Sequence, residues 1–134
     1  NYTILGDVVN NTSRLEGLTK RYGVGLIVTE EVKNKITDDT IVFRKLDIIT
    51  VKGKHLPTII YEALWKKDID PIVINDYEIA FLEYEKGDFV NARRHFKYLA
   101  DNGDKPAEKM MERLEKLGDS KPEGWDGIWR FDEK

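Results

Sequence analysis

The stretch NYTILGDVVNNTSRLEGLTKRY, residues 1–22, has the pattern of a strand end, a tight turn and an amphipathic helix. Gly6 permits a turn that residues with side chains resist. The Asp7 carboxylate can accept hydrogen bonds from the first free amides of the helix. Four apolar residues at helical spacing predict the buried face of this helix: Val8, Leu15, Leu18 and Tyr22.

Two polar residues of the expected helix, Asn10 and Arg14, are four positions apart and should lie one above the other beside the apolar face. A carboxamide and a fork-shaped guanidinium aimed at one point suit a polyanion. On spacing alone, an ordinary helix surface with Arg14 paired to Glu16 or Asp7 is the simpler interpretation.

The sequence that follows predicts an α+β layer. Gly23 is suited to a left-handed helix cap, and β-branched residues dominate the next apolar runs. The expected elements are a strand at 24–28, a helix at 30–36 capped by Thr29, a strand at 40–51 with a bulge at 45–47, a turn at 52–57 and a strand at 58–64. This layer needs no ligand to explain it.

The motif residues of this half are Tyr2-Thr3, Gly6-Asp7, Val9-Asn10, Ser13-Arg14-Leu15-Glu16 and, about one hairpin later, Val51-Lys52-Gly53-Lys54. In order and spacing they resemble the class III nucleotidyl cyclases, which convert ATP to cyclic AMP or GTP to cyclic GMP. The resemblance covers about residues 1–64. It implies the C-terminal part of a catalytic domain, with part of a ferredoxin-like sheet-and-helix layer.

The resemblance implies roles for four side chains. Asn10 would orient the ribose, Arg14 would contact the phosphate in the transition state, and Lys52 would meet the terminal phosphates. Thr3 stands at the base-selecting position, where a hydroxyl can hydrogen-bond the exocyclic amine of adenine, so ATP is favoured. The alternative for Lys52 is a solvated hairpin lysine, and a guanylyl cyclase is the alternative for the nucleotide.

The resemblance also implies two metal ions, Mg²⁺ or Mn²⁺, held by two aspartates from earlier in the family's domain. Asp7 follows the turn glycine and is a helix cap rather than one of those aspartates. We therefore expect no metal ligands in this chain, and no cyclic AMP from this chain alone. The family further implies a homodimer with sites at the interface. A chain that starts without Met inside a strand-like pattern indicates part of a longer protein.

The second half predicts helices. We expect a linker at residues 66–74 and helices at 75–86, 88–102 and 104–117, the first with capping-box spacing between Asn75 and Glu78. The first two helices resemble one tetratricopeptide repeat at Ala80, Gly87, Ala92 and Phe96. A lone repeat cannot bury its own face, so it should pack on the cyclase-like half, the third helix or another chain. A structural appendage and a peptide-binding groove are both open.

The tail, residues 119–134, carries Trp125 and Trp129, which we expect to clamp the chain end onto a groove. Its Trp-Asp-Gly-Ile-Trp motif resembles the ends of bacterial cyclases that carry a membrane-anchored sensor upstream. The organisation predicted from sequence is therefore residues 1–65 as the cyclase part, 66–74 as linker, 75–118 as helical region and 119–134 as tail.

Composition sets further limits. The 134 residues are 40% hydrophobic and 35% charged, with a net charge of -3, so no basic field attracts nucleic acid. The absence of cysteine excludes disulfides and cysteine-based zinc sites. No apolar run approaches the roughly 20 residues that span a bilayer. His55 and His95 lack metal-ligand spacing. We expect a cytoplasmic location without membrane contact, and a non-enzymatic cyclase-like dimerisation module remains the rival interpretation.

Overall fold

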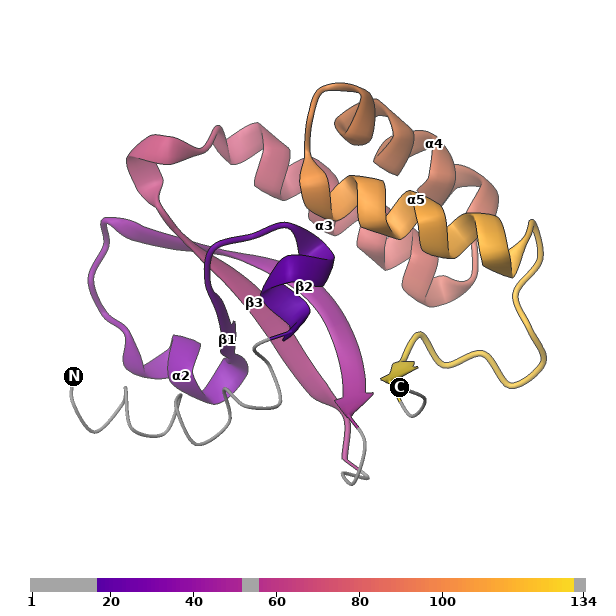
Figure 1. Cartoon of the computed structure of the whole chain (residues 1–134), viewed down its shortest axis with the longest axis horizontal. Coiled ribbons are helices and arrows are strands. Elements are labelled where there is room, and N and C mark those ends of the chain that lie inside the picture. The colour runs from indigo at the N-terminus through magenta and orange to yellow at the C-terminus, as the bar shows by residue number, and fades with distance from the viewer. Residues whose placement is uncertain (1–16, 52–55, 132–134) are drawn as a thin grey trace.

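The computed structural model describes residues 17–51 and 56–131, which form a mixed sheet with helices packed around it (Figure 1). The fold class is α+β, as the sequence predicts. Residues 17–22 are helical and are here called the 17–22 helix. The elements that follow are β1 (Ile27–Thr29), α2 (Glu30–Lys35), β2 (Ile41–Val51), β3 (Thr58–Trp65), the 3-10 turn η1 (Lys66–Asp68), α3 (Pro71–Lys86), α4 (Phe89–Asp101), α5 (Lys105–Leu117) and β4 (Trp129–Phe131).

The sheet has the strand order β1-β3-β2-β4. β3 pairs antiparallel with both β1 and β2, whereas β4 pairs parallel with the last residues of β2. In Figure 1, α3, α4 and α5 gather at one end of the molecule, and α2 lies beside β1 at the other. Strand β2 therefore occupies the middle of the sheet, between the hairpin partner that follows it and a strand from the far end of the chain.

The predicted bulge in β2 is confirmed. The register with β3 shifts between Lys45 and Asp47, so that Leu46 has no single partner on β3. Leu46 and Asp47 are consecutive and both fully buried. Successive residues of a regular strand point to opposite faces, and the extra residue of a bulge breaks this alternation.

A single hydrophobic core joins the sheet to the helical region. Its members come from the 17–22 helix, from β1 to β3 and from α3 to α5, so residues on both sides of the predicted 66–74 linker share it. The largest fully buried apolar side chains are Tyr22, Leu46, Ile49, Ile60, Tyr77, Phe81, Tyr84, Phe89, Phe96, Met110 and Leu114.

The predicted start of the first long helix, Asn75, is wrong. Helix α3 begins at Pro71, and the Asp70 side chain caps it by accepting a hydrogen bond from the Ile72 amide at 3.0 Å. Proline suits a first helical position, because its missing N–H would have no intrahelical partner there. The capping-box spacing of Asn75 and Glu78 therefore falls inside the helix, and the linker is shorter than predicted.

Other predicted boundaries agree closely with the structure. Gly87 closes α3 with a φ of 93°, and Asp88 and Asp104 cap α4 and α5. The predicted apolar face of α3 is confirmed as Tyr77, Ala80, Phe81 and Tyr84. The first short strand lies later than predicted, at Ile27–Thr29. None of the described helices is long and apolar enough to cross a bilayer.

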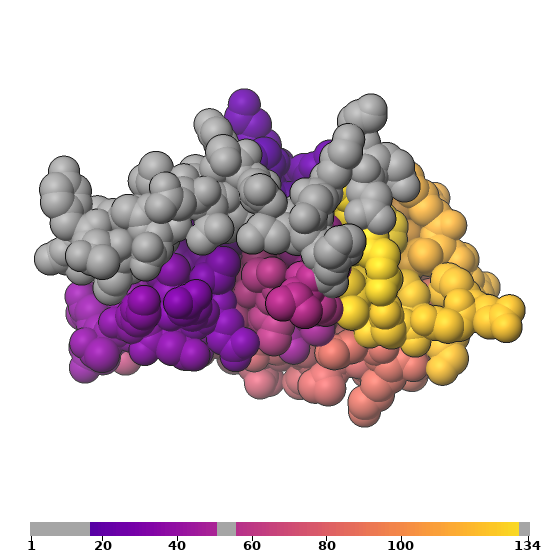
Figure 2. Space-filling model, turned by 90° about the horizontal axis from the view of Figure 1, so that it is seen from below, coloured from indigo at the N-terminus to yellow at the C-terminus, as the bar shows by residue number. Residues whose placement is uncertain are grey.

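The tail is clamped by tryptophan, as predicted. The Trp125 Nε1 donates to the backbone oxygens of Tyr84 and Glu85, both at 3.1 Å. Its ring packs edge-on against the rings of Tyr84 and Phe89, with centroids 5.1 and 5.2 Å away. The tail then adds β4 to the sheet, which the sequence did not predict. Figure 2 shows the tail, in yellow, lying beside the strands and the helical region.

Candidate functional site

The four residues predicted to act on a nucleotide, Thr3, Asn10, Arg14 and Lys52, lie outside the described residues. Their neighbours along the chain are described. Residue 17, the first described residue of the 17–22 helix, is three positions after Arg14 in sequence, and β2 ends at Val51, directly before Lys52. The described structure therefore supplies the supports of the candidate site, and the four predicted roles stay predictions.

The first support, the 17–22 helix, is anchored by its apolar face. Leu18 and Tyr22 are buried in the common core, as the predicted stripe requires. The helix ends at Gly23, whose φ of 71° is left-handed, and the Val24 amide bonds back to the Thr19 oxygen at 3.0 Å. The Arg21 guanidinium lies over the Phe131 ring, 4.9 Å from its centre, which joins this helix to β4.

A buried polar cluster ties this helix to β2. We call it the Asp47 cluster, and its members are Tyr22, Asp47, Tyr84 and Arg113. The Tyr22 hydroxyl donates to Asp47 Oδ2, and Arg113 Nη2 pairs with the same oxygen at 2.7 Å. Arg113 also donates from Nη1 to the Tyr84 hydroxyl at 3.0 Å and from Nη2 to the Tyr22 hydroxyl at 3.3 Å. The second Asp47 oxygen accepts from the Ile48 amide at 2.9 Å.

Burial fixes the protonation of this cluster. It raises the pKa of the Tyr22 hydroxyl well above its ordinary value, and the nearby Asp47 charge adds to the rise. Burial likewise raises the pKa of Tyr84 to about 12. For Arg113, burial lowers the pKa, but the interactions with Asp47, Tyr22 and Tyr84 together outweigh burial and raise the pKa well above its usual range. Near neutral pH the tyrosines stay protonated and Arg113 stays charged, so the cluster acts as a fixed tie.

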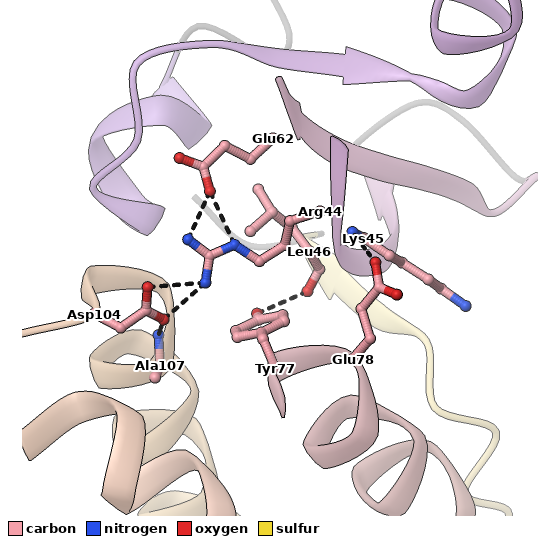
Figure 3. Close-up of polar contacts among 8 residues, drawn as sticks. All are labelled: Arg44, Lys45, Leu46, Glu62, Tyr77, Glu78, Asp104 and Ala107. Atoms are coloured by element: carbon pink, nitrogen blue, oxygen red, sulfur yellow. Dashed lines mark hydrogen bonds and ion pairs between the residues drawn. The ribbon is translucent and has the colours of Figure 1, made fainter. Parts of the chain in front are cut away.

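A second buried cluster, the Arg44 cluster, joins the sheet to the start of α5 (Figure 3). Arg44 of β2 contacts Glu62 of β3 through Nε at 3.0 Å and Nη2 at 2.8 Å. Its Nη1 lies 2.8 Å from both carboxylate oxygens of Asp104, which also accepts from the Ala107 amide at the start of α5. The Arg44 guanidinium lies 5.0 Å from the centre of the Tyr77 ring.

Helix α3 holds the bulge of β2 directly. The Tyr77 hydroxyl donates to the Leu46 oxygen at 2.9 Å, and the Glu78 carboxylate accepts from the Lys45 amide at 3.0 Å (Figure 3). These bonds satisfy backbone groups that a regular ladder would otherwise pair, since a bulge interrupts the ladder. The position of Asp47 within the core therefore depends on α3 as well as on β3.

Sequence reasoning did not single out Arg44, Asp47 or Arg113. Each is a charged residue inside an otherwise apolar pattern, Arg113 within the apolar stripe of α5 and the other two within β2. Buried charges are paired, so this pattern was a signal of an internal ion pair. It could not reveal the partners, which are distant in sequence.

The described residues group no metal site, and they line several hollows. Across residues 17–51 and 56–131, no three His, Asp or Glu side chains are grouped to hold a metal ion. A hollow of about 100 Å³ lies between the 17–22 helix, α5 and β4, with Arg21, Lys109 and Trp129 among its lining residues. It is smaller than the roughly 300 Å³ at which ligand pockets begin. Two other hollows are larger, one of about 470 Å³ beside Trp65 and one of about 440 Å³ between Arg93 of α4 and Glu115 of α5.

Part of the chain is related in sequence to adenylate cyclases. An adenylate cyclase of Anabaena cylindrica is 44% identical over 63 residues, which are 46% of this chain and 12% of that protein. Adenylate cyclase 1 of Rhizobium meliloti (strain 1021) is 38% identical over 63 residues, 47% of this chain and 9% of that protein. The terminal-differentiation specific adenylate cyclase of Dictyostelium discoideum is 41% identical over 64 residues, 46% of this chain and 3% of that protein.

The chain thus spans only a small part of the length of these relatives, from 3% to 12%. No family model matches the chain, and no solved structure matches it. The comparisons define one region of about 63 residues as adenylate cyclase-related. The tetratricopeptide-like character of the helical region stays a prediction.

Proposed function

We propose that this chain is the C-terminal part of an adenylyl cyclase catalytic domain, which forms cyclic AMP and pyrophosphate from ATP. The observation that carries the proposal is the identity of 38% to 44% with adenylate cyclases over about 63 residues. The resemblance of the motifs around Asn10, Arg14 and Lys52 to class III cyclases supports it.

The reaction defines what these side chains must do. The ribose 3′ oxygen attacks the α-phosphorus in line, loses its proton, and the bond to the leaving pyrophosphate breaks. Negative charge builds on the phosphoryl oxygens, so fixed cations and hydrogen-bond donors aimed there lower the barrier. In the proposal, Arg14 supplies the cation at the α-phosphate, Asn10 orients the ribose and Lys52 holds the terminal phosphates.

The base and the metal ions complete the proposed site. The Thr3 hydroxyl would accept from the exocyclic amine of adenine, which favours ATP over GTP. Two ions, Mg²⁺ or Mn²⁺, would supply Lewis acidity and charge neutralisation. The resemblance assigns those ions to two aspartates from earlier in the family's domain, so the proposal places them upstream of Asn1. A homodimer would bring the aspartates of one protomer to Asn10 and Arg14 of its partner.

A product assay tests the proposal. The protein that contains this chain, with its upstream sequence, is incubated with Mn²⁺ and either ATP or GTP, and cyclic AMP, cyclic GMP and pyrophosphate are measured. We expect cyclic AMP and pyrophosphate in equal amounts from ATP, and much less cyclic GMP. Lys52→Ala should weaken turnover, whereas the matched change Lys67→Ala at an exposed lysine should not.

Two other outcomes would replace the proposal. Cyclic GMP as the main product would identify a guanylyl cyclase. No cyclic nucleotide from either substrate would support the non-enzymatic alternative, a cyclase-like module for dimerisation or docking.

A further inference from the structure

We infer that Arg113 of α5 is a positioning residue for the proposed cyclase site, holding together the two segments that lead to Arg14 and Lys52. The inference rests on the proposed function, because the residues that it positions are those of that site. Arg113 itself would touch neither nucleotide nor metal.

The buried Arg113 guanidinium joins several elements of the fold. It contacts the Asp47 carboxylate of β2 at 2.7 Å and the Tyr22 hydroxyl of the 17–22 helix at 3.3 Å. It donates to the Tyr84 hydroxyl of α3 at 3.0 Å and lies 4.2 Å from the centre of the Trp129 ring of β4. The side chain is 5% exposed, so solvent cannot replace these contacts.

Two residues that Arg113 contacts, Tyr22 and Asp47, are close in sequence to the predicted site residues. Tyr22 is the last residue of the 17–22 helix, eight positions after Arg14 in sequence, and Asp47 lies in β2, five positions before Lys52. Tyr22 and Asp47 also bond to each other. A change at Arg113 therefore acts at once on both supports of the proposed site, although α5 is more than 50 residues later in the chain.

The shape of the Arg113 guanidinium suits this set of contacts. The two terminal nitrogens of Arg113 are used on three oxygens, those of Asp47, Tyr22 and Tyr84. A planar fork of donors can meet several acceptors at fixed angles, whereas a lysine ammonium is a single point of charge. The geometry thus calls for arginine, and Arg113→Lys should keep the charge while losing part of the tie.

The chain offers a matched control in Arg44. It is also a buried arginine, 3% exposed, and it also joins β2 to α5 through carboxylates. Among the described residues, its polar and ring contacts are with Glu62, Asp104 and the Tyr77 ring rather than with the 17–22 helix or β4. Arg44→Met should therefore remove a comparable buried ion pair without breaking a contact of the 17–22 helix.

The experiment compares Arg113→Met, Arg113→Lys and Arg44→Met in the complete protein, well below each melting temperature. Cyclic AMP formation gives kcat and KM for ATP, and hydrogen exchange reports on residues 17–22 and 46–51. We expect Arg113→Met to lower kcat by about 10- to 100-fold, the size of loss that small misplacements of reacting groups cause. Exchange at residues 17–22 should be faster, and Arg113→Lys should be intermediate in both readouts.

Arg44→Met should retain a kcat close to that of the unmodified protein, with residues 17–22 still protected. Equal loss of kcat in Arg113→Met and Arg44→Met would overturn the inference, because it would mean general destabilisation. Unchanged exchange at residues 17–22 in Arg113→Met would overturn it whatever the activity. An inactive unmodified protein combined with faster exchange in Arg113→Met would contradict the proposed function and still support the tie.

Discussion

Removing one charge of the Asp47–Arg113 pair should destabilise the chain more than removing both. Asp47 is 0% exposed and Arg113 is 5% exposed, so either partner left alone is an uncompensated buried charge. Breaking such a pair costs about 3–5 kcal/mol. We expect that loss in the free energy of unfolding for Arg113→Met, and a similar loss for Asp47→Asn.

The double variant Asp47→Asn, Arg113→Met carries neither charge. In the parent, the Ile48 amide and the Tyr22 hydroxyl donate to different oxygens of Asp47. The single amide oxygen of the variant can still accept from the Ile48 amide, and its amide nitrogen can donate to the Tyr22 hydroxyl oxygen in place of Arg113. What remains lost are the hydrogen bond that Tyr22 donates to Asp47 and the one that Arg113 donates to the Tyr84 hydroxyl. At about 1 kcal/mol each, the double variant should lose only about 2 kcal/mol.

Urea unfolding, followed by circular dichroism and tryptophan fluorescence, measures these free energies, provided that the slope against urea is the same in all variants. The four free energies form a double-mutant cycle. Single losses of about 3–5 kcal/mol each and a double loss of about 2 kcal/mol give a coupling of about 4–8 kcal/mol. A double variant that loses the sum of the two single losses would refute the reasoning, because the charges would then be energetically independent.

Three further predictions concern other contacts. Burial raises the pKa of Tyr84 to about 12 from 10.0, so the Tyr84 hydroxyl loses its proton at lower pH in the unfolded chain than in the folded chain. The free energy of unfolding should therefore fall by about 1.4 kcal/mol per pH unit between pH 10 and pH 12. Urea unfolding at pH 9, 10 and 11 measures this fall, which should be smaller in Tyr84→Phe. Trp125→Ala should lower the melting temperature by removing about 3 kcal/mol of packing. Trp125→Phe keeps one aromatic ring but loses the shared hydrogen bond to the Tyr84 and Glu85 oxygens, so it should cost less, about 1 kcal/mol. Asp70→Ala should cost about 1 kcal/mol as a lost helix cap; an equal loss in Asn75→Ala, which is exposed within α3, would contradict the observed helix start.

Local signals in the sequence predicted much of this fold. The bulge in β2, the left-handed glycines and the capping aspartates each depend on residues within one turn or strand. The predicted start of α3 was wrong because the sequence holds two possible helix starts. The helix begins at Pro71 with Asp70 as its cap, and not at Asn75 with its capping-box spacing to Glu78.

Contacts between distant residues could not be predicted in the same way. The parallel pairing of β4 with β2 joins Ile49 to Trp129, and Asp47 meets Arg113 across a similar distance in sequence. In neither pair does the sequence around one residue indicate which distant residue it will contact. The candidate site was predicted from motifs, and its four residues lie outside the described parts of the chain.

The turnover of the complete protein after Arg14→Ala tests the central claim most directly. The account predicts that cyclic AMP formation from ATP falls by about 10²–10³-fold, as when one preorganised donor to a developing charge is removed. The matched change Arg94→Ala, at an exposed arginine of α4, should leave turnover unchanged. Equal turnover in Arg14→Ala and Arg94→Ala would contradict the account.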